Sequence, residues 1–498
     1  MSTLGLDIGT SGGKAVVFNE EGDVVAWASR SYALRSPQAG WWELEAEEVW
    51  GCCAECIREA AGKAGTPVRA LGICSQGEAF VAVDLQGRAL SPAMVSSDIR
   101  AAEIVGQAIA AQGVDFFYRR TGHTPHSLFS WFKLLWLREH QPEVWRRAHQ
   151  FLCFEDFAQR RLGLDAAISW PLAGRTMLFN PETHEWSAEL LELAGLTPDR
   201  LARPLASGAV AGEIPRRIAQ DLGLAAGCQV VSGGHDQVAA ALGAGVAAAG
   251  QALYAMGSVE CVVAVSDRYR LSEGLRSANL CTYDHTVPGC RAHLAYNLTG
   301  SNLLAWYRDQ FAAEAAPATG SVYDWMFGQM PKSPTDLLVL PYFTATGTPH
   351  FDPRARGAIL GLEFRHTRFD ILAAMIEGLA FEMRLNLELL AAQGIVVNQF
   401  RATGGGTRNR AALQIKANVL QAPITPTQES EGGCLAMALL ARAALDQRPI
   451  QDYLASWIKL GQPVAPDPGP RPAYDESYGR YRQLYATLNP LLHPGARR

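Results

Sequence analysis

Residues 5–14 read GLDIGTSGGK, and this segment decides the fold. Apolar residues precede and follow a turn of small residues, so residues 3–18 are predicted to form a strand, a glycine-rich turn and a second strand. Residues 20–23, Glu-Glu-Gly-Asp, are a second turn signal, and residues 24–29 after them predict a third strand. The chain is therefore expected to open as a three-stranded meander.

The first of these turns has the composition of a phosphate-binding loop. Small residues let backbone N–H groups approach phosphate oxygens closely, and Thr10 and Ser11 add hydroxyl donors beside Gly9. Asp7 at the end of the first strand is a carboxylate suited to Mg²⁺, which prefers carboxylate, water and phosphate as ligands. An ordinary hairpin turn explains the same residues. The Walker A spacing is absent, which argues against a P-loop fold.

Helical and strand-like patterns alternate along the rest of the chain. Apolar residues recur at helical spacing in residues 45–61, 130–140, 369–390, 409–420 and 432–445. Short apolar runs predict strands at residues 71–75, 229–232 and 251–255. Near residue 248 the opening pattern of strand, small-residue turn and strand restarts, so we divide the chain into residues 1–247 and 248–498. The mixture predicts the α/β class.

Three further turns follow strands and carry small or acidic residues. They contain Gly257 and Ser258; Gly404, Gly405, Gly406 and Asn409; and His235, Asp236 and Gln237. Consecutive glycines before a helix let another molecule lie against the backbone, and the helix N-terminus favours anions. Asp236 is well placed for a base, although taken alone it is better explained as an N-cap, and His235 is interpreted as packed or solvent-bound. Taken in order, the turns supply the parts of a nucleotide-dependent kinase site.

The composition is that of an ordinary globular protein of two or three domains. The chain has 498 residues, 48% of them hydrophobic, and its 44 Lys+Arg against 49 Asp+Glu give a formal charge of −5. Without a basic run or a long Leu- and Ile-rich stretch, neither nucleic acid nor membrane is an expected partner. Ten scattered cysteines and the lack of an apolar leader predict a reduced, cytoplasmic location. Cys53 and Cys56 are interpreted as one face of a helix rather than a zinc site.

The ordered set of turns resembles the FGGY carbohydrate kinases, the family of glycerol, xylulose, ribulose, gluconate and fuculose kinases, essentially from end to end. The opening segment is similar to the family's first phosphate turn. Residues 133–140 are similar to its first signature, although Leu128 stands where a small or aromatic residue is usual, and residues 357–377 fit its long second signature. The resemblance implies two actin-like ATPase (ribonuclease H-like) domains, each with a mixed sheet flanked by helices, and a cleft between them.

The resemblance also implies roles for individual residues. Asp236 is similar to the family's catalytic base and Asp7 to its magnesium-associated carboxylate, so ATP and Mg²⁺ are the expected cofactors. The residues expected to bind ATP are Gly9, Thr10, Ser11, Lys14, Gly257, Ser258, Gly404, Gly405, Gly406 and Asn409. The residues expected to bind the sugar or polyol are Gln76, Glu78, Asp98, Arg100 and Gln237.

Two departures from the family pattern bear on the ligands. Glycerol kinases carry Gln-Arg-Glu at the first sugar loop and xylulose kinases Gln-Met-His, whereas residues 76–78 here are Gln-Gly-Glu. Gly77 therefore predicts a wider pocket, which disfavours glycerol and admits a pentose, a hexose or a related polyol. Glu260 places a negative charge beside the second phosphate turn, which counts against phosphate there.

The expected function is ATP-dependent phosphorylation of a hydroxyl of a small sugar or polyol, of the pentose or ketose type. A non-catalytic sugar or nucleotide sensor and an actin-like ATPase are the alternatives. The sequence leaves open the sugar, the hydroxyl and the oligomeric state, a homodimer included.

Overall fold

The predicted meander forms one side of a six-stranded sheet, in the order β13-β14-β5-β1-β2-β3. Its strands are β1 (Ser2–Ile8), β2 (Gly12–Phe18), β3 (Val24–Ser31), β5 (Val68–Ser75), β13 (Val210–Glu213) and β14 (Gln229–His235). β1, β2 and β3 pair antiparallel, whereas β5 and β14 run parallel to β1. β1 and β5 are apolar and buried along nearly their whole length, as central strands covered on both faces must be.

A second six-stranded sheet repeats this plan, in the order β17-β18-β16-β15-β21-β22. Its strands are β15 (Gln251–Met256), β16 (Glu260–Ser266), β17 (Tyr283–Asp284), β18 (Arg291–Asn297), β21 (Gln399–Thr403) and β22 (Ile424–Pro426). The antiparallel trio β15-β16-β18 corresponds to β1-β2-β3, and the parallel β21 and β22 correspond to β5 and β14. The strand, small-residue turn and strand that follow residue 248 are β15, the turn at Gly257 and Ser258, and β16.

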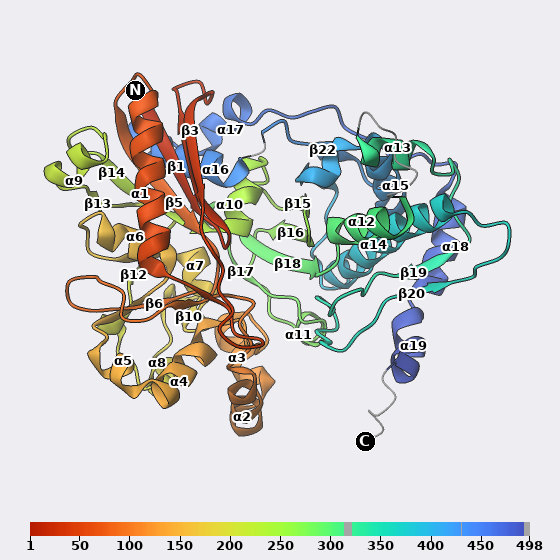
Figure 1. Ribbon diagram of the computed structural model, residues 1–498, viewed down its shortest axis with the longest axis horizontal. Helices are drawn as coiled ribbons and strands as arrows, with labels where there is room; N and C mark the ends of the chain where they lie inside the picture. Colours follow the sequence, from red (N-terminus) through yellow and green to blue (C-terminus); the bar gives the residue numbers. More distant parts are fainter. Residues whose placement is uncertain (313–320, 430, 493–498) are drawn as a thin grey trace.

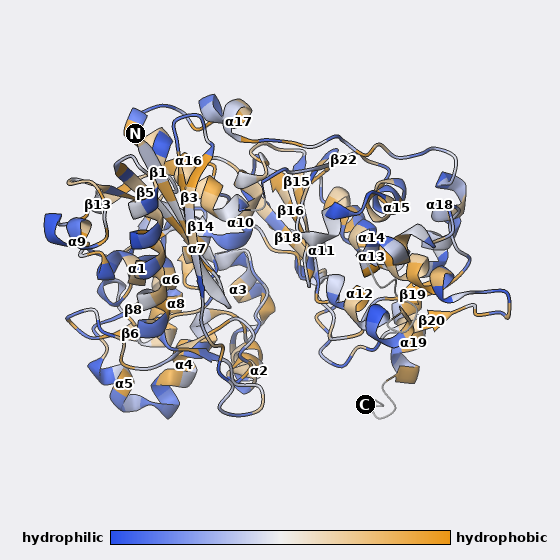
Figure 2. Ribbon diagram, turned by 45° about the horizontal axis from the view of Figure 1, so that its top comes forward, coloured by the Kyte–Doolittle hydropathy of each residue, from blue (hydrophilic) through white to orange (hydrophobic). Residues whose placement is uncertain are grey.

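The computed structural model describes residues 1–312, 321–429 and 431–492. The two sheets lie in separate lobes, and β1 and β3 of the first sheet are drawn in red, whereas β15, β16 and β18 of the second are drawn in green (Figure 1). Apolar residues are concentrated on the central strands and on α16 (Gly432–Asp446), whereas outer helices such as α5 (Pro142–Arg147) and α9 (Arg216–Asp221) are polar (Figure 2). The cores of the lobes therefore lie between their sheets and the covering helices.

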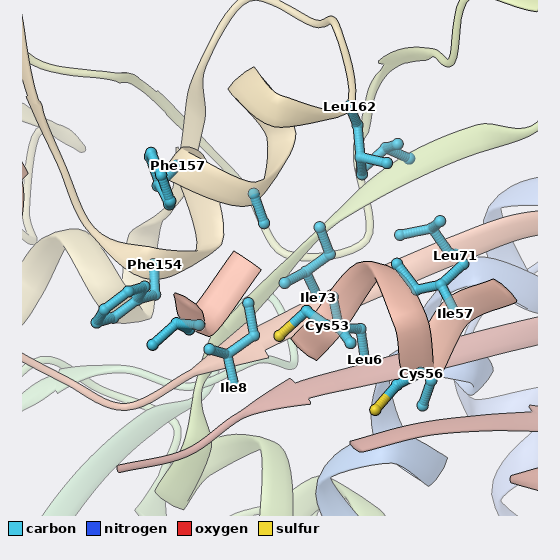
Figure 3. Close-up of a cluster of buried hydrophobic side chains, with 14 of the residues drawn as sticks. Leu6, Ile8, Cys53, Cys56, Ile57, Leu71, Ile73, Phe154, Phe157 and Leu162 are labelled. Carbon is cyan, nitrogen blue, oxygen red and sulfur yellow. The ribbon is translucent and has the colours of Figure 1, made fainter. Parts of the chain in front are cut away.

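Helices cover both faces of the first sheet. On one face α1 (Ala46–Lys63) buries an apolar stripe against β1 and β5, together with aromatic side chains of α6 (Phe154–Arg161) (Figure 3). The side chains that meet there include Leu6, Ile8, Cys53, Cys56, Ile57, Leu71, Ile73, Phe154 and Phe157. Burying each large aliphatic side chain contributes about 1.5–3 kcal/mol. Cys53 and Cys56 thus belong to a helix face, as predicted.

The opposite face of the first sheet is covered by a helix from the far end of the chain. α16 lies directly on β1, where a Cβ on Gly5 would sit only 1.8 Å from the Cys434 carbonyl oxygen, so this contact requires glycine. α17 (Gln451–Trp457) follows it, and Trp457 stacks on Phe18 with ring centroids 6.1 Å apart. The predicted division at residue 248 separates the two sheets but not their helices, because the chain returns to the first lobe through α16 and α17.

The helices expected from periodicity are present, with ends shifted by at most two residues. They include α4 (Ser130–His140), α14 (Arg368–Ala392) and α15 (Arg410–Leu420). Two more helices, α18 (Arg471–Tyr481) and α19 (Leu484–Leu492), follow α17. Within the described ranges, every helix is too short or too polar to cross a bilayer.

Shorter elements complete the lobes. The first lobe also contains β4 (Glu43–Leu44), β6 (Val81–Val83), β7 (Ala93–Met94), α2 (Ala102–Gln112), α3 (Val114–Thr121), β8 (Gln150–Leu152), β9 (Ala167–Ser169), α7 (Trp170–Gly174), β10 (Phe179–Asn180), β11 (Glu185–Trp186), α8 (Ala188–Ala194), η1 (Pro198–Arg200), β12 (Arg203–Leu205) and α10 (Asp236–Gly243). The second lobe also contains α11 (Glu273–Ser277), α12 (Ser301–Tyr307), η2 (Arg308–Ala312), α13 (Val322–Gly328), β19 (Leu338–Leu340), β20 (Ala358–Leu360) and η4 (Gly405–Arg408).

Candidate active site

Three neighbouring strands bring the first candidate residues to one edge of the first sheet. Asp7 lies near the end of β1, Gln76 directly follows β5, and Asp236 directly follows β14. These strands run parallel, and Asp7 and Gly234 both pair with Cys74 of the strand between them. Ligands of open α/β sheets bind outside the carboxyl ends of the strands, so this edge is where a site is expected.

Asp7 is a buried carboxyl with an unused oxygen. Its Oδ1 atom is buried and has no hydrogen-bond partner among the residues that the structure describes. A Cβ on Gly433, at the start of α16, would lie 3.0 Å from Asp7 Oδ2, so glycine keeps this approach open. Burial raises the pKa of Asp7 to about 6, the Cys74 hydrogen bond opposes this rise, and the charge of Glu431 adds to it. The unused oxygen marks a place for a cation or its water.

The first turn is tied to the sugar loop and to the returning chain. Thr10 Oγ1 donates to Gln76 Oε1 over 3.2 Å, and Gln76 Nε2 donates to the Gly9 carbonyl over 3.1 Å. Lys14 Nζ lies 2.5 Å from Glu431 Oε2, just before α16. These contacts fix the shape of the turn, and phosphate binding by Thr10, Ser11 and Lys14 stays a prediction.

Asp236 is the first residue of α10, and its side chain is 31% exposed. Burial raises its pKa to about 8, and the negative charges of Asp7 and Glu78 add to the rise, while the Gln237 backbone N–H and Arg175 oppose it. The shift shows that these carboxyls share one small region. Asp236 is therefore open to a small molecule and is a stronger base than an ordinary aspartate.

His235, which the sequence indicated to be packed or solvent-bound, is packed inside the site. Its imidazole is 4% exposed, and its Nε2 lies 3.1 Å from Asp236 Oδ1. Its Nδ1 lies 3.1 Å from the hydroxyl of Tyr283, which belongs to β17 of the second lobe. Burial lowers the pKa of His235 to about 3, so the ring is neutral. In the sequence, only its position next to the candidate base Asp236 indicated that His235 could belong to the site.

Glu78 is held ionised by partners that the sequence did not single out. Arg175 Nε donates to Glu78 Oε1 over 2.5 Å, and Ser96 Oγ donates to Oε2 over 2.7 Å. Burial opposes ionisation, but the charge of Arg175 holds the pKa of Glu78 below its ordinary value. The side chain of Glu78 is 4% exposed, and sugar binding by its carboxylate stays a prediction.

The space beside Gly77 is filled. A Cβ on Gly77 would lie 3.0 Å from Cδ2 and Nε2 of His235, so the imidazole occupies the volume that a side chain at residue 77 would take. The predicted wider pocket at this position is therefore wrong. The missing side chain in the sugar loop is replaced by one from another strand.

Asp98 and Arg100 form a buried pair behind the loop that follows β7. Arg100 Nη2 lies 2.7 Å from Asp98 Oδ2 and 2.7 Å from Glu43 Oε1, and the guanidinium lies 4.0 Å from the ring centroid of Trp41. The backbone N–H of Trp42 donates to Asp98 Oδ2 over 2.7 Å. The two side chains are 0% and 1% exposed. Their geometry favours support of this loop over the predicted direct contact with the sugar.

The two predicted ATP turns of the second lobe lie side by side. β15 and β21 are adjacent parallel strands, so the turns that follow them meet at one edge. A Cβ on Gly404, which has a φ of +93°, would sit 2.7 Å from the Met256 carbonyl oxygen, while Gly405 faces open space. Asn409 Oδ1 accepts from the backbone N–H groups of Ala411 and Ala412, so Asn409 is the N-cap of α15.

The charge of Glu260 does not face a phosphate. Its carboxylate is buried, ion-paired with Lys416 of α15 and hydrogen-bonded by the Tyr254 hydroxyl over 2.5 Å. Because Lys416 neutralises this carboxylate, the expectation that Glu260 counts against phosphate at Gly257 and Ser258 is wrong.

The second lobe also reaches the candidate base. Burial raises the pKa of Cys261, just after the turn at Gly257 and Ser258, and the charge of Asp236 contributes to the rise. Together with the Tyr283 contact, this places the start of β16 and the β17 strand near Asp236. Residues from both lobes therefore surround the carboxyl, and the predicted cleft itself stays a prediction.

The chain matches the FGGY family of carbohydrate kinases over both lobes. The N-terminal domain of the family matches residues 2–243, and its C-terminal domain matches residues 252–445. A glycerol kinase of Citrifermentans bemidjiense is 31% identical over 91% of this chain and 92% of the relative. A xylulose kinase of Staphylococcus xylosus is 24% identical over 97% of this chain and 99% of the relative. The crystal structure of xylulose kinase from Rhodospirillum rubrum, 28% identical, has a TM-score of 0.90 and covers 99% of this chain and 100% of that one.

This chain belongs to the FGGY family of carbohydrate kinases. The predicted α/β fold with two actin-like lobes is confirmed. As a member of the family, the protein is an ATP-dependent phosphotransferase that acts on an alcohol group of a sugar or polyol.

Proposed function

We propose that this kinase transfers the γ-phosphoryl group of ATP to a hydroxyl of a pentose, a ketose or a related polyol. The carrying observation is the Asp236 carboxyl, which is 31% exposed at the sheet edge where Asp7 and the sugar loop also lie. Burial, the main cause of its raised pKa, makes the ionised form of this carboxyl a stronger base than an ordinary aspartate.

In the proposed reaction, Asp236 accepts the proton of the substrate hydroxyl. The hydroxyl oxygen forms a bond to the γ-phosphorus while the bond between that phosphorus and the β–γ bridging oxygen breaks, and ADP leaves with the bond's electron pair. Such a transfer depends on positioning and charge neutralisation more than on covalent assistance. Proton acceptance of this kind contributes about 10²–10⁴-fold.

ATP is assigned to the turns of both lobes. In the second lobe, Gly404 packs against the backbone of Met256 at the end of β15, and Gly405 faces open space. The backbone at Gly405 is therefore accessible to a nucleotide. In the first lobe, the backbone N–H groups of Thr10 and Ser11 and the Ser11 hydroxyl are the proposed donors to phosphate. The Gly9 N–H donates to the Gly12 carbonyl, and the Thr10 hydroxyl donates to Gln76.

Mg²⁺ fits the surroundings of Asp7. The buried Oδ1 lacks a partner among the described residues, and the described residues hold no group of three His, Cys, Asp or Glu that would form a metal site without added ligands. Mg²⁺ usually binds through one or two carboxylates, waters and substrate phosphates, which is the set available here. When bound, the ion would neutralise charge on the transferred phosphate.

The substrate class rests on the sugar loop and on the relatives. The matched proteins include kinases named for xylulose and for glycerol. The ionised Glu78, fixed by Arg175 and Ser96, offers hydroxyl acceptors next to Asp236. Gln237, half-buried beside the base, is the proposed additional hydroxyl ligand.

A panel assay tests the proposal. ADP release would be measured with pentuloses, aldopentoses, hexoses, pentitols and glycerol, and the position of phosphate in the product would be assigned by NMR. We expect pentose- or ketose-dependent turnover that falls by about 10²–10⁴-fold in Asp236→Asn. Asp165→Asn, on a carboxyl that is fully exposed, is the matched control. Sugar-independent ADP release would indicate an ATPase, and no release with any compound would indicate a sensor.

A further inference from the structure

His235 connects three parts of the site that come from different strands. Its ring fills the space beside Gly77 in the sugar loop, its Nε2 lies 3.1 Å from Oδ1 of Asp236, and its Nδ1 lies 3.1 Å from the hydroxyl of Tyr283. The ring is also enclosed, with 4% exposure. The hydrogen bond at Nδ1 and the lack of free space hold the ring in one orientation, with Nε2 facing the carboxyl.

The protons of this arrangement follow from the partners. In the ionised form that can take the substrate proton, the Asp236 carboxylate only accepts hydrogen bonds, so in that form Nε2 must carry the proton that faces it. The ring is neutral because burial lowers the pKa of His235 to about 3, so Nδ1 carries none and must accept. The Tyr283 hydroxyl is therefore the donor to Nδ1. A chain of two donors runs from Tyr283 of the second lobe through His235 to the candidate base.

The histidine also depends on the glycine in the sugar loop. At residue 77 even a methyl group would stand 3.0 Å from Cδ2 and Nε2 of the ring, tighter than ordinary van der Waals contact. A larger side chain would push the imidazole away from Asp236. Gly77 and His235 therefore act as a size-matched pair.

We propose that His235 is a positioning residue for the base: it holds Oδ1 of Asp236 through Nε2–H and leaves Oδ2 to accept the proton of the substrate hydroxyl. This inference rests on the proposed kinase function. Because Tyr283 belongs to the second lobe, the orientation of the base depends on contact between the two lobes. His235 itself exchanges no proton with the substrate.

Other groups act on the same carboxyl, and all of them except Tyr283, which the second test changes, are common to every variant below. The titratable and charged groups around Asp236 are Asp7 on β1, Cys74 on β5, Glu78 in the sugar loop, Arg175 after α7, Cys261 on β16 and Tyr283 on β17. A donor bond from His235 favours the ionised form of Asp236, so its loss shifts the acid limb of the pH–rate profile upward.

The first test compares His235→Leu with His235→Gln. Leucine keeps much of the volume but has no donor, whereas the glutamine amide places a donor near the position of Nε2. We expect kcat/KM for the sugar to fall about 10- to 100-fold in His235→Leu, with the acid limb moving up by roughly one pH unit. Most of the loss should be recovered in His235→Gln, and KM for ATP should stay within about twofold of wild type, since the second-lobe ATP turns lie on other strands.

The second test removes only the distal donor. Tyr283→Phe deletes one oxygen atom and leaves the imidazole in place, so it remains informative if His235→Leu does not fold. We expect a fall in kcat of about 3- to 10-fold with an upward shift of the same limb. Tyr118→Phe is the matched control, because Tyr118 is an equally buried tyrosine whose hydroxyl donates to the Leu280 carbonyl instead.

The third test checks the pairing of Gly77 with His235. Gly77→Ala alone should lower kcat/KM by about 10-fold by displacing the ring. In a His235→Gly background the same alanine should add little further loss, because the ring that it would displace is gone. Additive losses would contradict the pairing.

The outcomes separate this inference from the function on which it rests. If wild type shows no sugar-dependent ADP release, the proposed function fails. If wild type is active but His235→Leu and Tyr283→Phe keep its kcat/KM and acid limb, the positioning role is overturned. A folded His235→Leu that loses activity without a shift of the acid limb, and that glutamine does not rescue, also overturns it, because it shows a packing role only.

Discussion

Glu377 in α14 offers a test of how burial controls a carboxyl in this fold. It lies in the second signature, and its side chain is 2% exposed. The Thr335 backbone N–H donates to Oε1 over 3.1 Å, and Thr335 Oγ1 contacts Oε2 at 2.8 Å. Burial raises the pKa of Glu377 from 4.5 to about 8, although the Thr335 contacts oppose the rise. Between pH 4.5 and about 8, Glu377 therefore keeps its proton in the folded protein and loses it in the unfolded chain.

The sign of the pH effect follows from this difference. The stability that the protonated carboxyl contributes is complete below pH 4.5, falls as the pH rises, and is lost once the pH passes about 8. At about 1.4 kcal/mol per pKa unit, the shift corresponds to roughly 3–5 kcal/mol of unfolding free energy. Glu377→Gln keeps one acceptor and one donor for Thr335 and has no charge to bury.

The assay is urea unfolding of wild type and Glu377→Gln between pH 5 and pH 9. The two proteins should be of similar stability at pH 5, and the variant should be more stable at pH 9 by roughly 3 kcal/mol or more. Glu143→Gln, on an exposed glutamate of α5, is the control and should leave the pH dependence as in wild type. Parallel curves for wild type and Glu377→Gln would refute the reasoning.

Three further substitutions test the supports of the site. Arg175→Met leaves Glu78 buried without its cation, so we expect a loss of about 3–5 kcal/mol in stability and a raised KM for the sugar, measured by urea unfolding and ADP release. Lys416→Met leaves Glu260 buried without its cation, so we expect a similar loss of stability and a raised KM for ATP. Gly404→Ala forces a side chain into a left-handed backbone position, and we expect KM for ATP to rise about 10-fold or more with little change in KM for the sugar.

Two control variants accompany these substitutions, one for the two buried cations and one for the glycine. Lys63→Met removes an exposed lysine that pairs with Glu59, and it should change stability by less than about 1 kcal/mol. Gly479→Ala adds a methyl group in open space on α18 and should leave both KM values unchanged. Wild-type stability in Arg175→Met or Lys416→Met would show that the buried pairs are not needed, and an unchanged KM for ATP in Gly404→Ala would remove this turn from the nucleotide site.

Much of the fold followed from local patterns. The small-residue turn after Asp7 and its repetition near Gly257 predicted two similar halves, and the two sheets have matching strand orders. Helical periodicity located α4, α14 and α16 closely, since an apolar stripe repeats over many residues. The positions of Asp7, Gln76 and Asp236 at strand ends were also readable, because parallel strands align such residues at one edge.

The errors came from contacts between distant segments. The lack of a side chain at Gly77 suggested an empty space. The ring of His235, the last residue of β14, lies in that space instead. Glu260 suggested an unfavourable charge, but Lys416 from α15 neutralises it. α16 packs on the first sheet and brings Gly433 beside Asp7. The predicted division at residue 248 assigned α16 to the second half of the chain, so it did not predict this contact.

The sequence by itself determined the order of strands, turns and helices and the chemistry available at each turn, since these depend on spacing along the chain. Only the tertiary structure decided which side chains share a space, which charges are paired, and that the second lobe reaches Asp236 through Tyr283 and His235. The physical reason is that burial and pairing depend on distances in space between residues far apart in sequence, and the spacing of residue types carries no such distances.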